Sequence, residues 1–158
     1  MRSASVQEIK QEMSHLKPAE LVHICLRLAR FKKENKELLT YLLFESGDEA
    51  GYIEEVKQEI DNQFEEINRS HLYFVKKSLR KILRMIGKHV RYIGSKSAEA
   101  ELLLHFLVRF KEMGIPYEQS PMLLNIYNGQ LKKVKAAIAT MHEDLQYDLL
   151  RKLSSVAG

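Results

Sequence analysis

The sequence predicts an all-α protein, and three observations support this prediction. Only 7 Gly and 3 Pro occur among 158 residues, and so few chain-breaking residues favour long regular elements. Leu, Glu and Lys, which have high helix propensity, are abundant. Apolar residues recur at spacings of three and four, and no segment shows the alternation typical of a strand. We therefore expect a compact bundle or short array of about seven helices, in a single domain over residues 1–158.

Three short helices are expected first, at about 5–16, 18–31 and 34–45. Pro18 suits the first position of the second helix, because a residue there needs no partner for its backbone N–H. The third helix has apolar side chains around most of its circumference, so we expect it to be central and buried. Gly47 then ends this helix, and Asp48 caps the next one.

Four longer helices are expected next, at about 49–68, 71–93, 97–113 and 121–153. The helices at 71–93 and 121–153 are amphipathic, whereas the helix at 97–113 is apolar nearly all round and is expected to be central. The apolar residues of the last helix follow a spacing close to the heptad, which is typical of helix pairing. Thr140 and Glu143 resemble a capping box that would divide this helix, while its unbroken apolar stripe favours one helix.

Two neighbouring helices of opposite charge are the most unusual feature of the chain. Residues 46–68 contain eight acids and one base, and residues 69–98 contain nine bases and no acid. Seven of these bases fall on one arc of the 71–93 helix, which we call the basic face: Lys76, Lys77, Arg80, Lys81, Arg84, Lys88 and Arg91. Phe74 and Tyr92 lie within or beside it. Gly87, in the middle of the same helix, predicts either a close helix approach or a kink.

Three interpretations of the basic face remain open. The acidic helix at 49–68 would neutralise it within the chain, through exposed ion pairs that each contribute about 0.2–1 kcal/mol. Alternatively, it is an interface for an acidic protein or for the acidic helix of a second copy. In the third interpretation it binds the phosphates of RNA or DNA, and Phe74 and Tyr92 stack on bases.

A second polar group of residues lies on the central helix at 97–113. Glu101, His105 and Arg109 follow one another at intervals of four residues, so they share one side of the helix. One interpretation is a polar cluster in a cleft, with His105 as a proton donor or acceptor. The other is the exposed strip of a mostly buried helix.

No motif in the sequence predicts catalysis. No two His residues are spaced as a helical metal-binding pair, and no glycine-rich phosphate loop is present. We therefore expect no catalytic residue, metal, cofactor or small-molecule substrate. The single cysteine, Cys25, gives no sign of an oxidising compartment, and we find neither a signal peptide nor an apolar run that could span a bilayer. A cytoplasmic location without a membrane partner is the expectation.

These patterns favour a non-catalytic protein–protein interaction or scaffold protein that self-associates. The alternative is an accessory protein that binds RNA or DNA with the basic face of the 71–93 helix. The two functions differ in a visible way. A scaffold predicts a basic face covered by the acidic helix or by a second subunit, and a nucleic-acid-binding protein predicts an open one.

Overall fold

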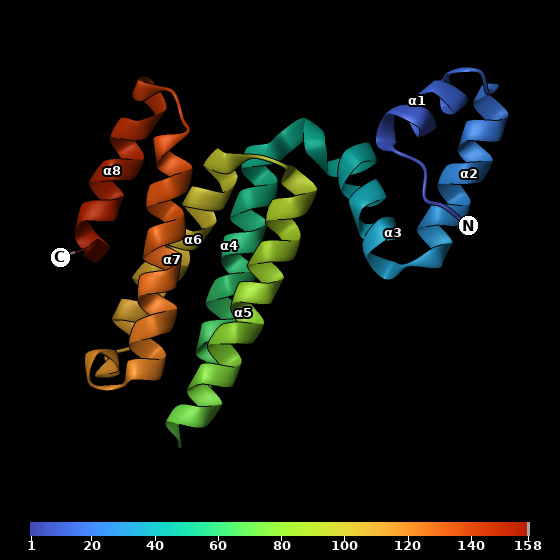
Figure 1. Cartoon of the computed structure of the whole chain (residues 1–158). Coiled ribbons are helices and arrows are strands. Elements are labelled where there is room, and N and C mark those ends of the chain that lie inside the picture. Colours follow the sequence, from blue (N-terminus) through green and yellow to red (C-terminus); the bar gives the residue numbers. More distant parts are fainter. Residues whose placement is uncertain (158) are drawn as a thin grey trace. The chain divides into compact units, whose positions relative to one another are not determined.

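The computed structural model describes residues 1–157 and confirms the all-α prediction (Figure 1). All regular elements in these residues are helical. Contacts divide the chain into two compact units, one formed by Met1–Phe44 and one that begins at Glu45. Each unit is described here by itself. The single domain over residues 1–158 stays a prediction, because two compact units can belong to one domain.

The first unit contains three short helices, α1 (Val6–Ser14), α2 (Pro18–Phe31) and α3 (Lys33–Thr40), followed by a π-helical turn, Tyr41–Glu45. Ser5 and Glu8 form a capping box that starts α1, and Pro18 occupies the first turn of α2 as predicted. The side-chain amide of Asn35 donates to the carbonyl of Leu28 at 2.8 Å, which ties α3 to the end of α2.

The prediction of a buried central helix at 34–45 is wrong. No residue of α3 is buried, and in the turn that follows it Tyr41 is buried but Leu42, Leu43 and Phe44 are exposed, with Phe44 at 77%. A helix with apolar side chains on all sides is buried only where neighbouring elements are long enough to cover those side chains. The helices of this unit have only 9, 14 and 8 residues, and none of them contains a buried residue.

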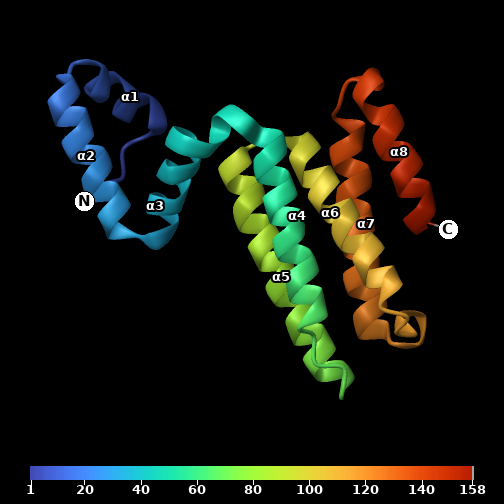
Figure 2. The ribbon, with the colours of Figure 1, turned by 180° about the vertical axis from the view of Figure 1, so that it is seen from behind.

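The second unit contains five long helices: α4 (Glu49–Glu65), α5 (Leu72–Ile93), α6 (Lys96–Glu112), α7 (Pro121–Ala139) and α8 (Glu143–Ala157). Short 3₁₀ turns, Ser46–Asp48 and Tyr117–Gln119, precede α4 and α7. Side chains of Asp48, Ser95 and Ser120 accept backbone N–H groups at the starts of α4, α6 and α7. The helices alternate in direction, so α4, α6 and α8 run one way and α5 and α7 the other (Figures 1 and 2).

Within this unit the helices form two layers. α6 packs between α4 and α8 in the first layer, while α5 packs on α4 and α6, and α7 packs on α6 and α8. The prediction that the 97–113 helix is central is therefore confirmed, because α6 contacts each of the other four long helices. Its rings continue the core into the neighbouring helices. Phe106 lies 5.4 Å from Phe64 of α4, and Phe110 lies 5.3 Å from Tyr127 of α7, between ring centroids.

The long helix expected at 121–153 is in fact two helices, because α7 ends at Ala139 and α8 begins at Glu143. α8 folds back along α6, and the Tyr127 hydroxyl of α7 donates to the carbonyl of Val156 in α8 at 2.5 Å. The heptad-like seam continues across the break because both helices pack on α6. Tyr127, Val134, Ile138 and Leu149 are buried in the core of this unit, so these residues of the seam are unavailable to a second copy.

Candidate anionic-partner interface

The basic face lies on α5, in the second layer of the array. Lys77, Arg80, Lys81, Arg84 and Arg91 are exposed, while Lys76 and Lys88 are partly buried. α7, the other helix of this layer, adds exposed Lys132, Lys133 and Lys135. Neither helix contains an Asp or a Glu. The lysines and arginines of these two helices are therefore not balanced by acids of the same helices. They give this layer a positive electrostatic potential.

The acidic helix α4 does not neutralise the exposed bases of the basic face. Its acids pair with Lys57 in α4 itself and with residues of α6, through Glu54 and Lys57 at 3.0 Å and Asp61 and His105 at 2.7 Å. Across residues 1–157, no acid of α4 is paired with the exposed bases of α5. α4 and α5 pack through apolar residues and through a hydrogen bond between the Tyr52 hydroxyl and His89 Nδ1. Lys77, Arg80, Lys81, Arg84 and Arg91 thus remain exposed beside α4.

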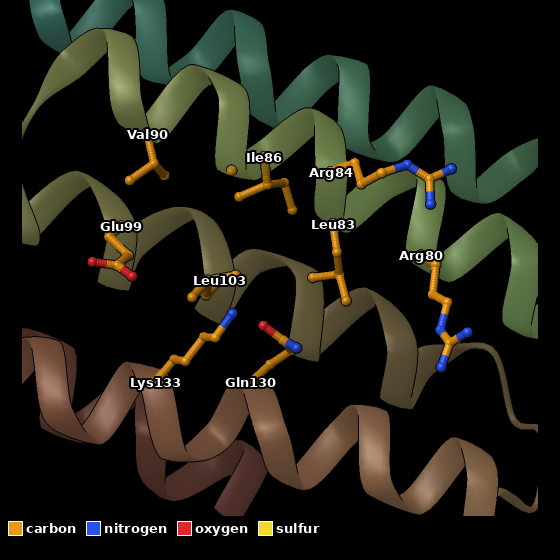
Figure 3. A pocket seen from close by; sticks show the side chains of 10 residues that line it. Arg80, Leu83, Arg84, Ile86, Val90, Glu99, Leu103, Gln130 and Lys133 are labelled. Atoms are coloured by element: carbon orange, nitrogen blue, oxygen red, sulfur yellow. The ribbon is translucent and has the colours of Figure 1, made fainter. Parts of the chain in front are cut away.

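A groove of about 430 Å³ lies between α5, α6 and α7 (Figure 3). It is lined by Arg80, Leu83, Arg84, Ile86, Gly87 and Val90 of α5, Glu99 and Leu103 of α6, and Gln130 and Lys133 of α7. Figure 3 shows Leu83, Ile86 and Val90 pointing from α5 into this space, with Gln130 and Lys133 pointing toward them from α7. The groove therefore combines an aliphatic lining with cationic groups from two helices.

The charge in the groove is unbalanced. Arg80, Arg84 and Lys133 form no ion pair in the described part of the chain, whereas Glu99 pairs with Lys96 at 2.9 Å. Gly87, which the sequence linked to a close helix approach or a kink, adjoins open space: a Cβ added there would meet no atom within 4 Å. Its role in this structure is to keep one wall of the groove without a side chain.

Of the two rings expected to stack on bases, the structure exposes one. Phe74 is 41% exposed and contacts the ring of Tyr73 at a centroid distance of 5.7 Å. Tyr92 is only 7% exposed and packs against His89, so it presents no free face to a base. Tyr92 borders the basic face, and its ring lies edge-on to the ring of His89, which is bonded to Tyr52 of α4.

Glu101, His105 and Arg109 do not form a free polar strip, because each pairs with a residue of α4. Glu101 accepts from Lys57 at 2.7 Å, His105 contacts Asp61 at 2.7 Å, and Arg109 contacts Glu65 at 2.8 Å. We call these three pairs the polar ladder. α4 and α6 run in the same direction and share a four-residue spacing, so all three pairs form together.

The sequence contained a signal for this ladder. Lys57, Asp61 and Glu65 also follow one another at intervals of four, and each could pair with the α6 residue at the matching position. Partial burial lowers the pKa of the Lys57 ammonium, but hydrogen bonds to Glu101 and Glu54 outweigh this effect and the pKa is raised. Lys57 is therefore held in its charged form as a structural cation.

Replacing Arg109 by Met is expected to lower the free energy of unfolding by about 1–2 kcal/mol. Arg109 contacts three carboxylates, those of Asp61, Glu65 and Glu112, at 3.2, 2.8 and 3.0 Å. Without the guanidinium these acids repel one another. Urea unfolding measures the loss, and salt should reduce it because screening weakens the repulsion. Arg151→Met, which removes an exposed arginine of α8, is the matched control; equal losses in both variants would contradict the role of the ladder.

A smaller cavity of about 270 Å³ adjoins His105 and is lined by Lys57, Glu101, Leu104, Val108, Lys152 and Ser155 as well. The Ser155 hydroxyl donates to the carbonyl of Lys152 at 2.6 Å, so it is not bonded to His105. His105 Nε2 is within hydrogen-bond distance of Asp61. His105 and Asp61 therefore form an imidazole–carboxylate pair beside this cavity.

Comparisons with known proteins give no relative for this chain: no family model, no curated protein and no solved structure matches it. In residues 1–157, no three His, Cys, Asp or Glu side chains gather as a group that could hold a metal ion. None of the helices described here combines the length and apolar content needed to cross a bilayer.

Proposed function

We propose that this chain is a non-catalytic interaction protein that binds an acidic region of a partner protein through the layer formed by α5 and α7. The observation that supports this best is the set of five exposed bases on the basic face: Lys77, Arg80, Lys81, Arg84 and Arg91. Its exposed lysines and arginines are not neutralised by the acids of α4, and α7 extends the positive surface with three more lysines. Like charges gathered on one face repel one another, and a partner of opposite charge relieves that repulsion.

The proposal is tested by the binding of a fluorescently labelled acidic polypeptide, poly-glutamate, at about 50 and 200 mM salt. Binding is expected at low salt and should weaken as salt screens the charges. The variant Lys77→Glu/Lys81→Glu should bind at least about tenfold more weakly. Lys10→Glu/Lys36→Glu, which makes the same charge change at exposed positions of the first unit, is the control. Absence of binding at low salt, or equal loss in the control, would contradict the proposal.

Self-association is part of the same proposal. α4 exposes Glu54, Glu55 and Glu59, and this acidic surface on one copy complements the basic face of another. Sedimentation velocity at low and high salt measures it: a species larger than the monomer should appear at low salt and dissociate at high salt. We also propose a cytoplasmic location, since the single Cys25 gives no indication of an oxidising environment.

A second candidate function is the binding of single-stranded RNA or DNA, which the exposed bases of the basic face also favour. Exposed Phe74 and Tyr73 lie one turn before Lys76 and Lys77. Aromatic rings that can stack on bases therefore lie next to lysines that can bind phosphates. Fluorescence anisotropy of a labelled single-stranded RNA, compared between the wild type and Lys81→Glu/Arg84→Glu, tests it. Tight RNA binding that weakens steeply with salt, together with no binding of poly-glutamate, would move the assignment to nucleic acid.

A further inference from the structure

The groove between α5, α6 and α7 has a composition that a purely electrostatic surface does not need. Ile86 and Leu103 are buried at its floor, while Leu83 and Val90 are partly buried along its wall. Arg80, Arg84 and Lys133 stand around these aliphatic groups without an ion-pair partner in the described residues. A ligand that satisfies both parts must carry aliphatic groups to cover the floor and anionic groups to meet the cations.

We infer that this groove binds an acidic amphipathic helix of a partner protein, whose aliphatic side chains cover Leu83, Val90 and Leu103 and whose carboxylates meet Arg80, Arg84 and Lys133. This inference rests on the proposed function and names the segment of the partner that is recognised. Leu83, Ile86 and Val90 follow one another at intervals of three and four along α5. A helical ligand presents its own apolar side chains at the same intervals.

A helix fits this groove better than an extended segment does. The walls are helices, whose backbone N–H and C=O groups are already bonded to one another, so they offer no free edge to a strand. An extended peptide would leave its own backbone groups unpaired against aliphatic side chains, which is costly. A helix satisfies its backbone internally and buries only side chains.

Nucleic acid fits the groove less well than it fits the outer side of α5. The lining contains no aromatic residue on which a base could stack. Glu99 also lies in the lining, and its carboxylate would repel a phosphate. The aliphatic lining instead matches Leu, Ile or Val side chains of a protein.

The acidic surface of α4 in a second copy is also a poor occupant of the groove. The acidic surface of α4 exposes Glu54, Glu55 and Glu59, and the aliphatic residues of this helix, Ile53, Val56 and Ile60, are buried in the core. This surface has the charge to approach the basic face but no apolar side chain to cover Leu83 and Val90.

A substitution at Gly87 can fill the groove without removing a charged side chain. A Cβ at Gly87 meets no atom within 4 Å, and the same holds at Gly129 in the middle of α7, which is not part of the lining. Leu at either position improves helix propensity, so both variants are expected to fold. Gly87→Leu places a side chain in the groove, and Gly129→Leu is the matched control that leaves the groove empty.

The test uses two labelled acidic peptides with the same number of glutamates: one with Leu at spacings of three and four, and one with Ala in place of each Leu. Anisotropy titrations at about 50 mM salt compare them on the full chain. The Leu peptide is expected to bind at least about tenfold more tightly than the Ala peptide, because only it covers the aliphatic lining. Gly87→Leu should weaken the Leu peptide by about tenfold, and Gly129→Leu should not.

Arg80→Glu/Arg84→Glu should weaken both peptides, because it reverses charge beside the groove. Equal affinity of the wild type for the two peptides, or unchanged binding of the Leu peptide to Gly87→Leu, would overturn the groove inference while leaving the proposed function in place. Absence of binding by either peptide and by poly-glutamate would overturn both.

Discussion

Replacing Phe106 by Ala is expected to lower the free energy of unfolding by about 3–5 kcal/mol. The side chain has no exposed surface, and its ring lies 5.4 Å from Phe64 and 5.9 Å from Phe110 between centroids. It lies on α6, the helix that contacts α4, α5, α7 and α8. A cavity at this position cannot close by moving one helix, because several elements surround it.

Urea unfolding followed by far-UV circular dichroism measures this loss as a change in the main transition. Phe31→Ala is the matched control, since it deletes the same atoms from a ring that is 82% exposed at the end of α2. The control should shift the transition by less than about 0.5 kcal/mol. Losses of similar size in the two variants would show that α6 is not the centre of the core.

The second large effect concerns alkaline pH and Tyr127. Burial, together with the neighbouring Tyr117, raises the pKa of the Tyr127 phenol from 10.0 to about 12. The folded protein therefore keeps this proton over a pH range in which the unfolded chain loses it. The stabilisation is fully present below about pH 10 and is lost as the pH rises toward 12, at about 1.4 kcal/mol per pH unit and about 2–3 kcal/mol in total.

Chemical unfolding at several pH values between 9 and about 12 tests this expectation. Tyr127→Phe should be less stable at neutral pH, because the hydrogen bond to the Val156 carbonyl is lost, but its stability should fall less steeply above pH 10. Tyr73→Phe, at an exposed ring of α5, controls for the other groups that titrate in this range. Parallel pH curves for the wild type and Tyr127→Phe would contradict the prediction.

The elements with one clear apolar stripe were predictable from the sequence. On α5, the stripe through Val75, Leu79, Ile82 and Ile86 is buried in the structure. The central position of α6 followed from its apolar circumference. In both helices the pattern of residues determines the buried side, because a long helix in a layered array has enough neighbours to cover it.

The same reasoning failed where burial depends on what lies nearby. Leu42 and Leu43 are as apolar as the core of α6, but their helix lies in a unit too small to cover them. The break after Ala139 was ambiguous for a related reason. Ile138 and Leu149 both pack on the core, so the apolar period continues although the chain reverses direction between them.

The candidate site was only partly predictable. The basic face could be located from the spacing of its lysines and arginines, but the groove could not, because it needs α6 and α7 beside α5. Lys133 and Leu103, which line it, are unremarkable in the sequence alone. One half of the polar ladder was predicted from the sequence, namely the α6 residues. Their partners on α4 could not be assigned without knowing that α4 and α6 lie side by side and run in the same direction.

The order of charges along the polar ladder has a consequence for how α4 and α6 are aligned. In the observed register each nitrogen-bearing side chain faces a carboxylate, with Lys57 opposite Glu101, His105 opposite Asp61, and Arg109 opposite Glu65. Sliding one helix by a single turn, about 5.4 Å, would place Asp61 opposite Glu101 in one direction and Lys57 opposite His105 in the other. Neither slipped arrangement keeps all three attractive pairs. The polar ladder thus disfavours packing of α4 and α6 in a shifted register, which their apolar contacts alone would distinguish less well. Partly exposed ion pairs can have this effect even when each one stabilises the fold only weakly.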